Sequence, residues 1–427
     1  MRILEGVKAK AEVAKLAGRL NRLTGVESVV SEIVNDVREN GDRALRRFAE
    51  RWDGLGSEQP IRVSQREMKG AWDSLPRAQR NDLRAALKLA AHNIRRFAER
   101  QMPKDWMRKK DGVSTGQIVR PLAAVGCYVP GGRYPLPSTL LMTVIPAQVA
   151  GVERICVVSP QPRAETLAAA AMLGVSEFYR IGGAQAVAAL AYGTPSIPRV
   201  NKIVGPGNLY VTAAKKLVAF DCGIDFLAGP TEALIVSHSG CAEFIAADLV
   251  AQAEHDPEAT SVFITISGAL AKQVVASTER LSQGNTLARQ ALHSHGSVLL
   301  AKSTAEAMVW ANEIASEHLT VDADDLPSVR NAGSIFVGDY SAQAAGDYVA
   351  GPNHVLPTAG AARCRGGLTV QDFVKVITVQ QLTLKGVRRL GPAGIRLAEA
   401  EGLAAHAESF RVRLKSGKLK RSVSKHA

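Results

Sequence analysis

The stretch that decides the fold runs from Ala123 to Phe220, where short apolar runs alternate with helical patterns. The runs are, in order, AAVGCYV (123–129), ICVVS (155–159), PRAETLAAAAML (162–173), FYRIGG (178–183), AQAVAALAYG (184–193), VNKIVGPGN (200–208) and LYVTAAKKLVAF (209–220). Alternation of this kind at intervals of about 20 to 30 residues predicts βαβ units and a parallel sheet.

A second series of the same kind begins after Pro230. Its expected strands are EALIVS (232–237), SVFITIS (261–267), SVLLA (297–301) and GSIFVG (333–338), and its expected helices run through Phe244 to Ala253, from Ala269, and through Ala307 to Ala315. Two successive series predict an α/β protein with two similarly built domains, although no repeat is visible residue by residue.

Helical patterns flank these two series. Before about residue 105, one predicted face holds Val30, Ile33, Val34 and Val37, and another holds Leu83, Leu87, Ala90, Ile94 and Phe97. After about residue 368 the pattern is helical again, and Gly391-Pro392-Ala393-Gly394 is expected to break it before a terminal helix rich in Ala and Glu.

Length and composition exclude several classes of protein. With 427 residues, 46% of them apolar, the chain can bury several cores, and at about 100–200 residues per domain two to three domains are expected. No run approaches the ~18 consecutive apolar residues of a membrane span, so we expect no membrane partner.

The start of the chain and its cysteines bear on the compartment. MRILEGVKAKAEVAKLAGRL (1–20) lacks an apolar core followed by a small-residue cleavage site, so we expect no signal peptide and a cytoplasmic protein. The five cysteines include no C-x-x-C motif and predict reduced, structural thiols. They are Cys127, Cys156, Cys222, Cys241 and Cys364.

The formal charge of +13 raises the question of nucleic-acid binding. Part of it falls in the C-terminal tail, where Lys415, Lys418, Lys420, Arg421 and Lys425 occur with no acidic residue. Aromatic residues make up only 5% of the chain, and no basic run is interleaved with them to stack bases. We therefore expect a solvated tail, no nucleic-acid partner, and a charge that mildly favours anionic ligands such as a dinucleotide.

Three glycine-containing turns follow predicted strands: Pro130-Gly131-Gly132, Gly182-Gly183-Ala184-Gln185 and Gly205-Pro206-Gly207-Asn208. The last precedes a helical pattern, where backbone N–H groups at a helix start can face a pyrophosphate. The usual dinucleotide fingerprint is absent, because Tyr210 stands where that motif needs a small residue. Each turn alone is more often only a tight turn, but three in one series favour a ligand site.

Four residues carry donors that suit zinc: Gln252, His255, Asp347 and His406. Gln252 and His255 lie three positions apart on a predicted helix and share a face, so both can reach one ion. The long separations to Asp347 and His406 indicate nothing by themselves, and such residues are more often hydrogen-bonded histidines and a capping aspartate. A metal site and ordinary structural roles both remain open on spacing alone.

Glu317 and His318 form an adjacent carboxylate and imidazole. One interpretation is a helix C-terminus, where the helix dipole favours histidine. The other is a catalytic pair, in which the imidazole moves protons near neutral pH and the carboxylate activates water. The two interpretations are compatible.

The motifs themselves resemble the histidinol dehydrogenase family, in order and over nearly the whole chain. The matching strings are GCYVPGG (126–132), IGGAQAVAALAYGT (181–194), KIVGPGN (202–208), AGPTE (228–232), QAEHDP (252–257), SEHL (316–319), AGSIFVGDYS (332–341), AGDY (345–348), GPNHVLPT (351–358) and EGLAAHAES (401–409). Two departures are small: Thr231 replaces the familiar serine and keeps its hydroxyl, and Ser316 replaces the more usual proline.

The resemblance implies a role for each candidate residue. Proton transfer falls on Glu317 and His318. The remaining roles are zinc binding by Gln252, His255, Asp347 and His406; NAD contacts by Tyr128, Gln185 and Asn208; and substrate contacts by Thr231, Gln252, His255, His318, Asp347, His354, Glu401 and His406.

The resemblance also implies an architecture of two Rossmann-like parallel-sheet domains with helical N-terminal and C-terminal segments, in a homodimer with shared active sites. The expected limits are a helical arm at 1–24, a first domain at 25–125 and 232–368, a second, NAD-contacting domain at 126–231, and a C-terminal segment at 369–427. This last segment, with its basic tail at 415–427, is expected to complete the partner's site.

The implied reaction is the four-electron oxidation of L-histidinol to L-histidine through L-histidinaldehyde, the last two steps of histidine biosynthesis. It uses one zinc per subunit and two NAD molecules in succession. Two alternatives stay open: a relative that oxidises another small primary alcohol, and a zinc hydrolase in which Glu317 activates a metal-bound water.

Overall fold

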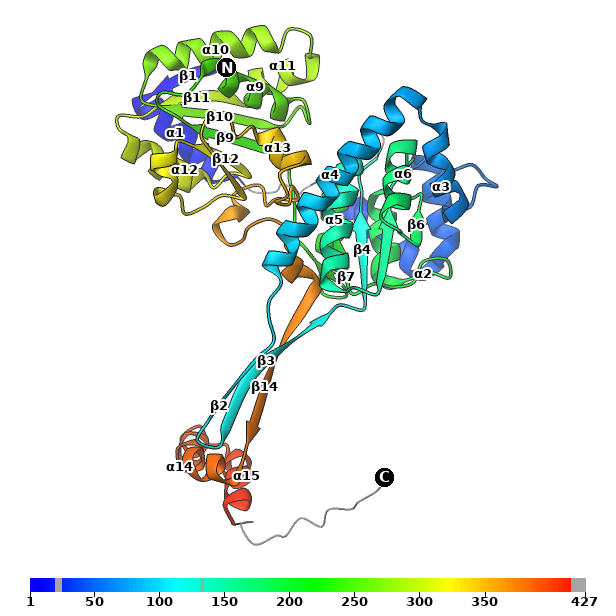
Figure 1. Ribbon diagram of the computed structural model, residues 1–427, viewed down its shortest axis with the longest axis vertical. Coiled ribbons are helices and arrows are strands. Elements are labelled where there is room, and N and C mark those ends of the chain that lie inside the picture. Colours follow the sequence, from blue (N-terminus) through cyan, green and yellow to red (C-terminus); the bar gives the residue numbers. More distant parts are fainter. Residues whose placement is uncertain (20–24, 132–133, 416–427) are drawn as a thin grey trace. The chain divides into compact units, whose positions relative to one another are not determined.

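The structure is a computed structural model that describes residues 1–19, 25–131 and 134–415 (Figure 1). Residues 20–24 of the expected arm, Gly132 and the tail beyond residue 415 lie outside the described residues. The chain forms two compact units: Met1–Met102 with Leu122–Phe373, and Pro103–Pro121 with the residues from Val374 onward. No described helix is long and apolar enough to cross a membrane.

The first unit contains a six-stranded parallel sheet, sheet A, with helices on both faces (Figure 1). Its strands, in spatial order, are β1 (Arg2–Glu5), β11 (Gly296–Leu300), β10 (Thr260–Thr265), β9 (Glu232–Val236), β12 (His318–Val321) and β13 (Ser334–Val337). Alternate residues of β9 point to opposite faces. Leu234 and Val236 therefore share one apolar core, and Ala233 and Ile235 share the other.

Each face of sheet A is covered by its own helices. The first face packs against α1 (Gly6–Ala17) and α12 (Thr304–Ile314), and the second against α9 (Ala242–Ala253) and α10 (Gly268–Leu281). The helix α11 (Thr286–His295) packs beside α9. Smaller elements complete this part of the unit: η1 (Ala323–Ser328), α13 (Gln343–Tyr348), η2 (Ala361–Arg363) and η3 (Val370–Phe373).

The same unit contains a five-stranded parallel sheet, sheet B. Its strands, in spatial order, are β6 (Glu177–Tyr179), β5 (Arg154–Val158), β4 (Ala124–Tyr128), β7 (Lys202–Val204) and β8 (Gly223–Ile224). Its connecting helices are α5 (Pro137–Ala150), α6 (Ala164–Met172), α7 (Gly183–Tyr192) and α8 (Leu209–Val218). The two parallel sheets confirm the predicted α/β fold class.

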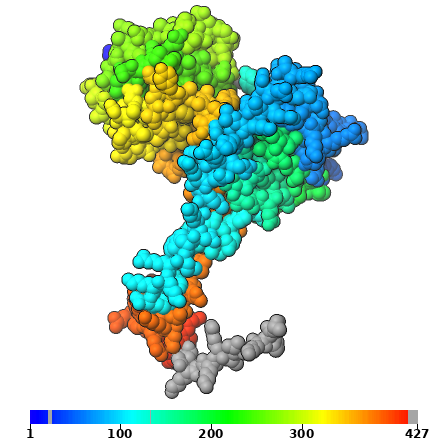
Figure 2. Space-filling view, viewed as in Figure 1, coloured from blue at the N-terminus to red at the C-terminus, as the bar shows by residue number. Residues whose placement is uncertain are grey.

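The helices before sheet B pack on that sheet's own helices. They are α2 (Glu27–Trp52), which bends at Gly41, α3 (Gln65–Ser74) and α4 (Arg77–Gln101). In the contacts between elements, α2 packs on α7 and α8, α3 on α6, and α4 on α5; Figure 2 shows the blue surface of the N-terminal helices over the green one. This grouping differs from the expected first domain, in which residues 25–125 were joined to 232–368. The reason is that the apolar face of α2 shares a core with sheet B.

The N-terminal arm is not wholly helical. Its residues Arg2–Glu5 form β1 and extend the edge of sheet A beside β11, with Ile3 opposite Val298, before α1 begins at Gly6. The helical interpretation of this segment was therefore wrong for its first residues, because the unpaired edge of β11 accepts a further strand.

The second unit is built on a three-stranded antiparallel sheet with the order β14-β3-β2. Its strands are β2 (Trp106–Lys110), β3 (Val113–Pro121) and β14 (Val374–Leu382), followed by α14 (Leu384–Ala400) and α15 (Ala404–Lys415). We had expected a helical segment after residue 368. The strand β14 shows that this expectation was wrong for Val374–Leu382.

The helix α14 also continues through the expected break at Gly391–Gly394. These glycines permit the close packing of α14 on α15: a Cβ at Gly394 would lie 2.6 Å from the ring of Phe410. The small residues here serve helix contact rather than a turn.

Candidate active site

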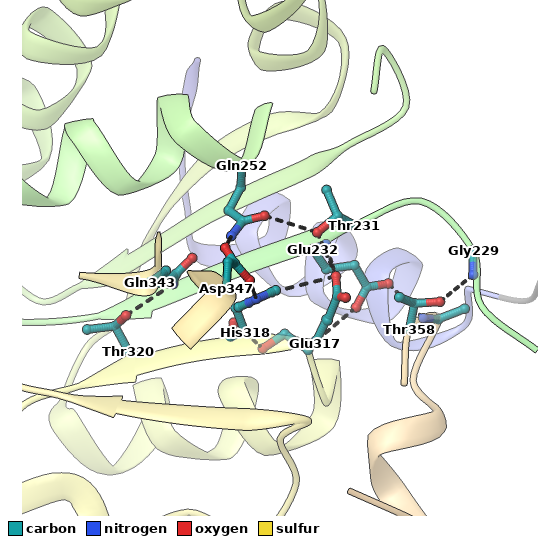
Figure 3. A network of polar contacts seen from close by, with 12 residues as sticks. Gly229, Thr231, Glu232, Gln252, Glu317, His318, Thr320, Gln343, Asp347 and Thr358 are labelled. Atoms are coloured by element: carbon teal, nitrogen blue, oxygen red, sulfur yellow. Dashed lines mark hydrogen bonds and ion pairs between the residues drawn. The ribbon is translucent and has the colours of Figure 1, made fainter. Parts of the chain in front are cut away.

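The amino ends of two neighbouring strands of sheet A carry the site. Thr231 precedes β9 and Glu317 precedes β12, and these strands pair with His318 opposite Ala233. The helix α9 runs back toward this edge before β10 begins, so it delivers Gln252 there as well (Figure 3). Folding thus brings together residues that are up to about 90 positions apart in the chain.

A sharp turn presents Glu317 to its neighbours. The helix α12 ends at Ala315, which has a left-handed φ of 52°, and the Ser316 hydroxyl donates to the carbonyl of His318 at 3.0 Å. His318 is the first residue of the strand β12. The interpretation of Glu317 and His318 as a helix C-terminus therefore does not hold.

The Glu317 carboxylate is held by two donors on the segment that enters β9. Its Oε2 accepts a hydrogen bond from the Thr231 hydroxyl at 2.6 Å and one from the Glu232 backbone N–H at 2.9 Å. Thr231 also lies 3.1 Å from Oε1 of Gln252, and its single hydroxyl hydrogen can serve only one acceptor at a time. The hydroxyl that Thr231 shares with serine therefore links the carboxylate to the amide.

His318 is buried between two carboxylates. Its Nε2 lies 3.1 Å from Oδ1 of Asp347, and its Nδ1 lies 3.6 Å from Oε2 of Glu317. Burial lowers the pKa of His318, but Glu317 and then Asp347 together raise it to about 10. Nδ1 is buried, faces the Glu317 carboxylate and has no hydrogen-bond partner among the described residues.

Asp347 joins the imidazole to the candidate metal ligands. Its Oδ2 accepts from Nε2 of Gln252 at 3.2 Å. Burial raises the pKa of this carboxyl, but the His318 hydrogen bond and charge outweigh it and hold the pKa below the ordinary value. The charge of His255 acts in the same direction, which places this exposed imidazole near Asp347.

The fourth candidate ligand, His406, belongs to the second compact unit, where it lies exposed in the first turn of α15. Within the described residues, no group of three or more His, Cys, Asp or Glu side chains is arranged to hold a metal. An amide oxygen, a carboxylate and an imidazole are nonetheless donors that zinc accepts, so the residues of the first unit fit part of a zinc shell. The Gln252 oxygen can turn toward an ion by an amide flip.

The candidate substrate residues are divided in the same way. His354 follows α13, and its Nδ1 bonds the carbonyl of Asp347 at 2.7 Å while its Nε2 lies 3.1 Å from the Thr139 hydroxyl. Burial lowers the pKa of His354, which favours its neutral form. Glu401 caps the end of α14 in the second unit and is exposed.

The described residues of the three glycine turns, from Pro130, Gly182 and Gly205, follow the carboxyl ends of β4, β6 and β7 in sheet B. The strand order reverses between β4 and β7, and ligands of open parallel sheets bind at such a switch point. Tyr128 ends β4, and its hydroxyl accepts from the N–H of Gly183 at 3.0 Å. Asn208 follows β7 and caps α8 by accepting from the N–H of Val211 at 3.1 Å.

A buried aspartate that sequence reasoning missed fixes the middle turn. Oδ2 of Asp53 accepts from the N–H of Gly182 at 2.9 Å and from Nε2 of Gln185 at 3.1 Å. Burial raises the pKa of Asp53. In the sequence, Asp53 lies beside Gly54 between two helical patterns, and no spacing signal connects it to a turn about 130 residues later.

A buried ion pair that also escaped the sequence analysis fixes the last turn. Oδ2 of Asp225 accepts from the N–H of Gly205 at 2.8 Å, and Nζ of Lys215 lies 2.6 Å from Oδ1 of Asp225. Lys215 donates as well to the carbonyl of Gly205 at 2.5 Å. Its position within an apolar helix, AAKKLV, is the only signal that sequence offered.

Two parallel sheets in one compact unit, with a buried carboxylate–imidazole pair at one sheet and a polar switch point at the other, have the arrangement of an α/β oxidoreductase. A family model described as "Histidinol dehydrogenase" matches residues 18–414 of this chain. The chain therefore belongs to the histidinol dehydrogenase family.

Individual relatives agree with the family match. The histidinol dehydrogenase of Methanothermobacter thermautotrophicus is 48% identical over 400 residues, covering 90% of this chain and 93% of its own. That of Geobacter metallireducens is 45% identical, with 91% and 92% covered. The crystal structure of histidinol dehydrogenase from Elizabethkingia anophelis superposes with a TM-score of 0.91 at 34% identity, covering 97% of this chain and 98% of the other.

Proposed function

We propose the zinc- and NAD-dependent form of the family's reaction for this protein: oxidation of L-histidinol to L-histidine through L-histidinaldehyde, in histidine biosynthesis. The observation that carries the proposal is the buried Glu317–His318 pair, whose imidazole Nδ1 has no hydrogen-bond partner among the described residues. A carboxylate and an imidazole side by side supply the two proton acceptors that this reaction needs.

The first oxidation needs one of these acceptors. His318 takes the hydroxyl proton of histidinol while the carbon-bound hydrogen leaves as hydride, and the product is the aldehyde. NAD would supply the hydride acceptor for this oxidation, and a second NAD molecule would supply it for the next.

The second oxidation needs water. His318 first releases its proton to solvent. Glu317 then removes a proton from a water molecule whose oxygen bonds to the aldehyde carbon, giving the hydrate anion, and His318 takes the remaining hydroxyl proton as the second hydride leaves. The product is the carboxylate of histidine. One water and two hydride acceptors are consumed for each histidinol.

Gln252, His255 and Asp347, with His406, would hold the zinc ion. A zinc ion there would bind the imidazole and amino nitrogens of the substrate, because nitrogen ligands suit zinc. Asp347 now raises the pKa of His318. Its engagement with a cation would lower that pKa toward the range in which imidazole accepts protons.

Tyr128, Gln185 and Asn208 would contact NAD. Support comes from their position at the turns that follow β4, β6 and β7 of sheet B, and from the reversal of strand order between β4 and β7. Asp53 and Asp225 would keep the two later turns in shape through the hydrogen bonds described above.

His354, Glu401 and His406 would contact the substrate, with Thr231. We propose that Glu401 and His406 come from the partner subunit in a cytoplasmic homodimer. Both residues lie exposed in a compact unit different from the one that carries Glu317. An isologous dimer would then hold two shared sites.

Metal analysis tests the zinc proposal independently of activity. Purified protein should contain about one zinc per chain, and Asp347→Ala should lower this content by at least about tenfold, because a zinc site with a missing ligand binds far more weakly. The exposed Asp324→Asn serves as the matched control and should keep its zinc. Purified protein that contains no zinc, or an Asp347→Ala variant that keeps its full zinc content, would contradict the proposal.

A further inference from the structure

A reciprocal pair of glutamates lies behind the catalytic pair. The backbone N–H of Glu232 donates to Oε2 of Glu317 at 2.9 Å, and the backbone N–H of Glu317 donates to Oε2 of Glu232 at 3.3 Å (Figure 3). Each residue thus holds the other by its main chain and its side chain at once. The position and direction of the Glu317 carboxylate depend on both bonds.

Glu232 is buried, with its side chain 5% exposed, and an arginine balances its charge. Nη2 of Arg19 lies 2.9 Å from Oε2 of Glu232. The other oxygen, Oε1, accepts from the backbone N–H of Ala359 at 2.8 Å. Ala359 has a left-handed φ of 52°, so this bond stabilises a backbone conformation that alanine rarely adopts.

The geometry points to Glu232 as a positioning residue for Glu317, kept ionised by Arg19. It acts through the backbone of Glu317 and touches neither substrate nor cofactor. The inference rests on the proposed function, in which Glu317 activates water. It gives a role to Glu232 and Arg19, to which the sequence analysis assigned none.

A positioning carboxylate is effective only while it is ionised, because a proton on either oxygen displaces one of the backbone donors. Burial raises the pKa of Glu232 to about 7, while Arg19 lowers it and Glu317 adds to the rise. Two other charged groups face this cluster. His318 lies 3.6 Å from Glu317, and the positive charge of Arg363 repels that of Arg19 and lowers the pKa of Arg19. Below neutral pH, Glu232 should therefore release Glu317 from its position.

The arginine side chain provides the sharper test. Arg19→Met removes the cation and leaves both backbone donors in place, so the pKa of Glu232 should rise and the acid limb of the kcat profile should move up by about one pH unit. We expect kcat to be about tenfold below wild type near pH 6.5 and within about twofold near pH 9. Arg19→Lys keeps the charge and should restore the wild-type profile.

The matched control is Arg280→Met, which removes an exposed arginine on α10 that pairs with Glu243. Its profile should overlay the wild type. The inference is overturned if the Arg19→Met profile also overlays the wild type, or if its loss is the same at every pH and lysine does not restore it. A merely structural role would change the unfolding temperature and leave the limb in place.

Glu232→Gln gives a second readout. It should lower kcat by at least about tenfold at every pH and change KM for histidinol by less than about threefold, because two backbone donors lose their anionic acceptor. A wild-type kcat would overturn the inference. If this variant does not fold, the Arg19 variants decide alone. Failure of the proposed function has a different sign. Glu317→Gln would then oxidise histidinaldehyde at the wild-type rate, whatever pH profiles the Arg19 variants give.

Discussion

Replacing Glu317 by glutamine should slow the oxidation of histidinaldehyde by about a hundredfold or more, while oxidation of histidinol to the aldehyde falls far less. Glutamine has nearly the same shape, and its amide oxygen can still accept from Thr231 and from the Glu232 N–H. What it loses is the ability to take a proton from water. Only the second oxidation needs that step.

The two half-reactions are measured separately by supplying either histidinol or histidinaldehyde and following the first turnover of NADH. Glu243→Gln, an exposed carboxylate on α9, controls for the loss of a negative charge and should leave both rates unchanged. An equal loss in both half-reactions would mean that Glu317 serves His318 in each step and does not activate water.

Mixing two inactive variants should restore about a quarter of wild-type activity if the sites are shared. His318→Ala removes the proton acceptor in the first compact unit, and His406→Ala removes the candidate ligand on α15 in the second. In a mixed dimer, one site receives both defects and the other receives none. Each variant alone should be nearly inactive, because every site in its homodimer is damaged.

The measurement needs chain exchange, by joint refolding or coexpression with two tags, followed by an assay of the unfractionated mixture; the purified doubly tagged dimer should show about half of wild-type activity, because one of its two sites is intact. Light scattering gives the mass of the particle. A mixture of His318→Ala with Glu317→Gln is the control, because both residues lie in the same unit and no combination of chains restores an intact site. Activity that stays at the level of the single variants would contradict shared sites.

The two parallel sheets were predictable because their strands are buried on both faces. Runs such as ALIV (233–236) and VFI (262–264) are continuously apolar, and the structure buries every residue of β9. The exposed strand β14 was missed because its side chains meet solvent and show no apolar run of that kind. Its concentration of β-branched residues, VKVITVQQL, was the signal available for it.

The grouping of elements was harder to predict than the elements themselves. Local patterns located the helices from Glu27 to Gln101, but their partner sheet depends on which apolar faces meet in three dimensions. The same limit applies to Asp53 and Glu232. Their roles come from hydrogen bonds to Gly182 and Glu317, which lie far away in sequence and leave no periodic pattern.

The sequence predicted which chemical groups form the candidate site. It did not predict how these groups are arranged in space. Adjacent carboxylate and imidazole groups at 317–318 indicated proton transfer, and the structure adds that both lie at the amino end of β12 beside Asp347. The position of His406 in a separate unit could not be derived from spacing.

The most direct test of the central claim is the number of NADH molecules formed for each L-histidinol consumed. A four-electron oxidation predicts two NADH and one histidine, measured by absorbance and by amino-acid analysis of the same sample. One NADH with accumulating aldehyde, or NADH only with a different primary alcohol, would contradict the account. Absence of NADH with any alcohol would point to the hydrolase alternative.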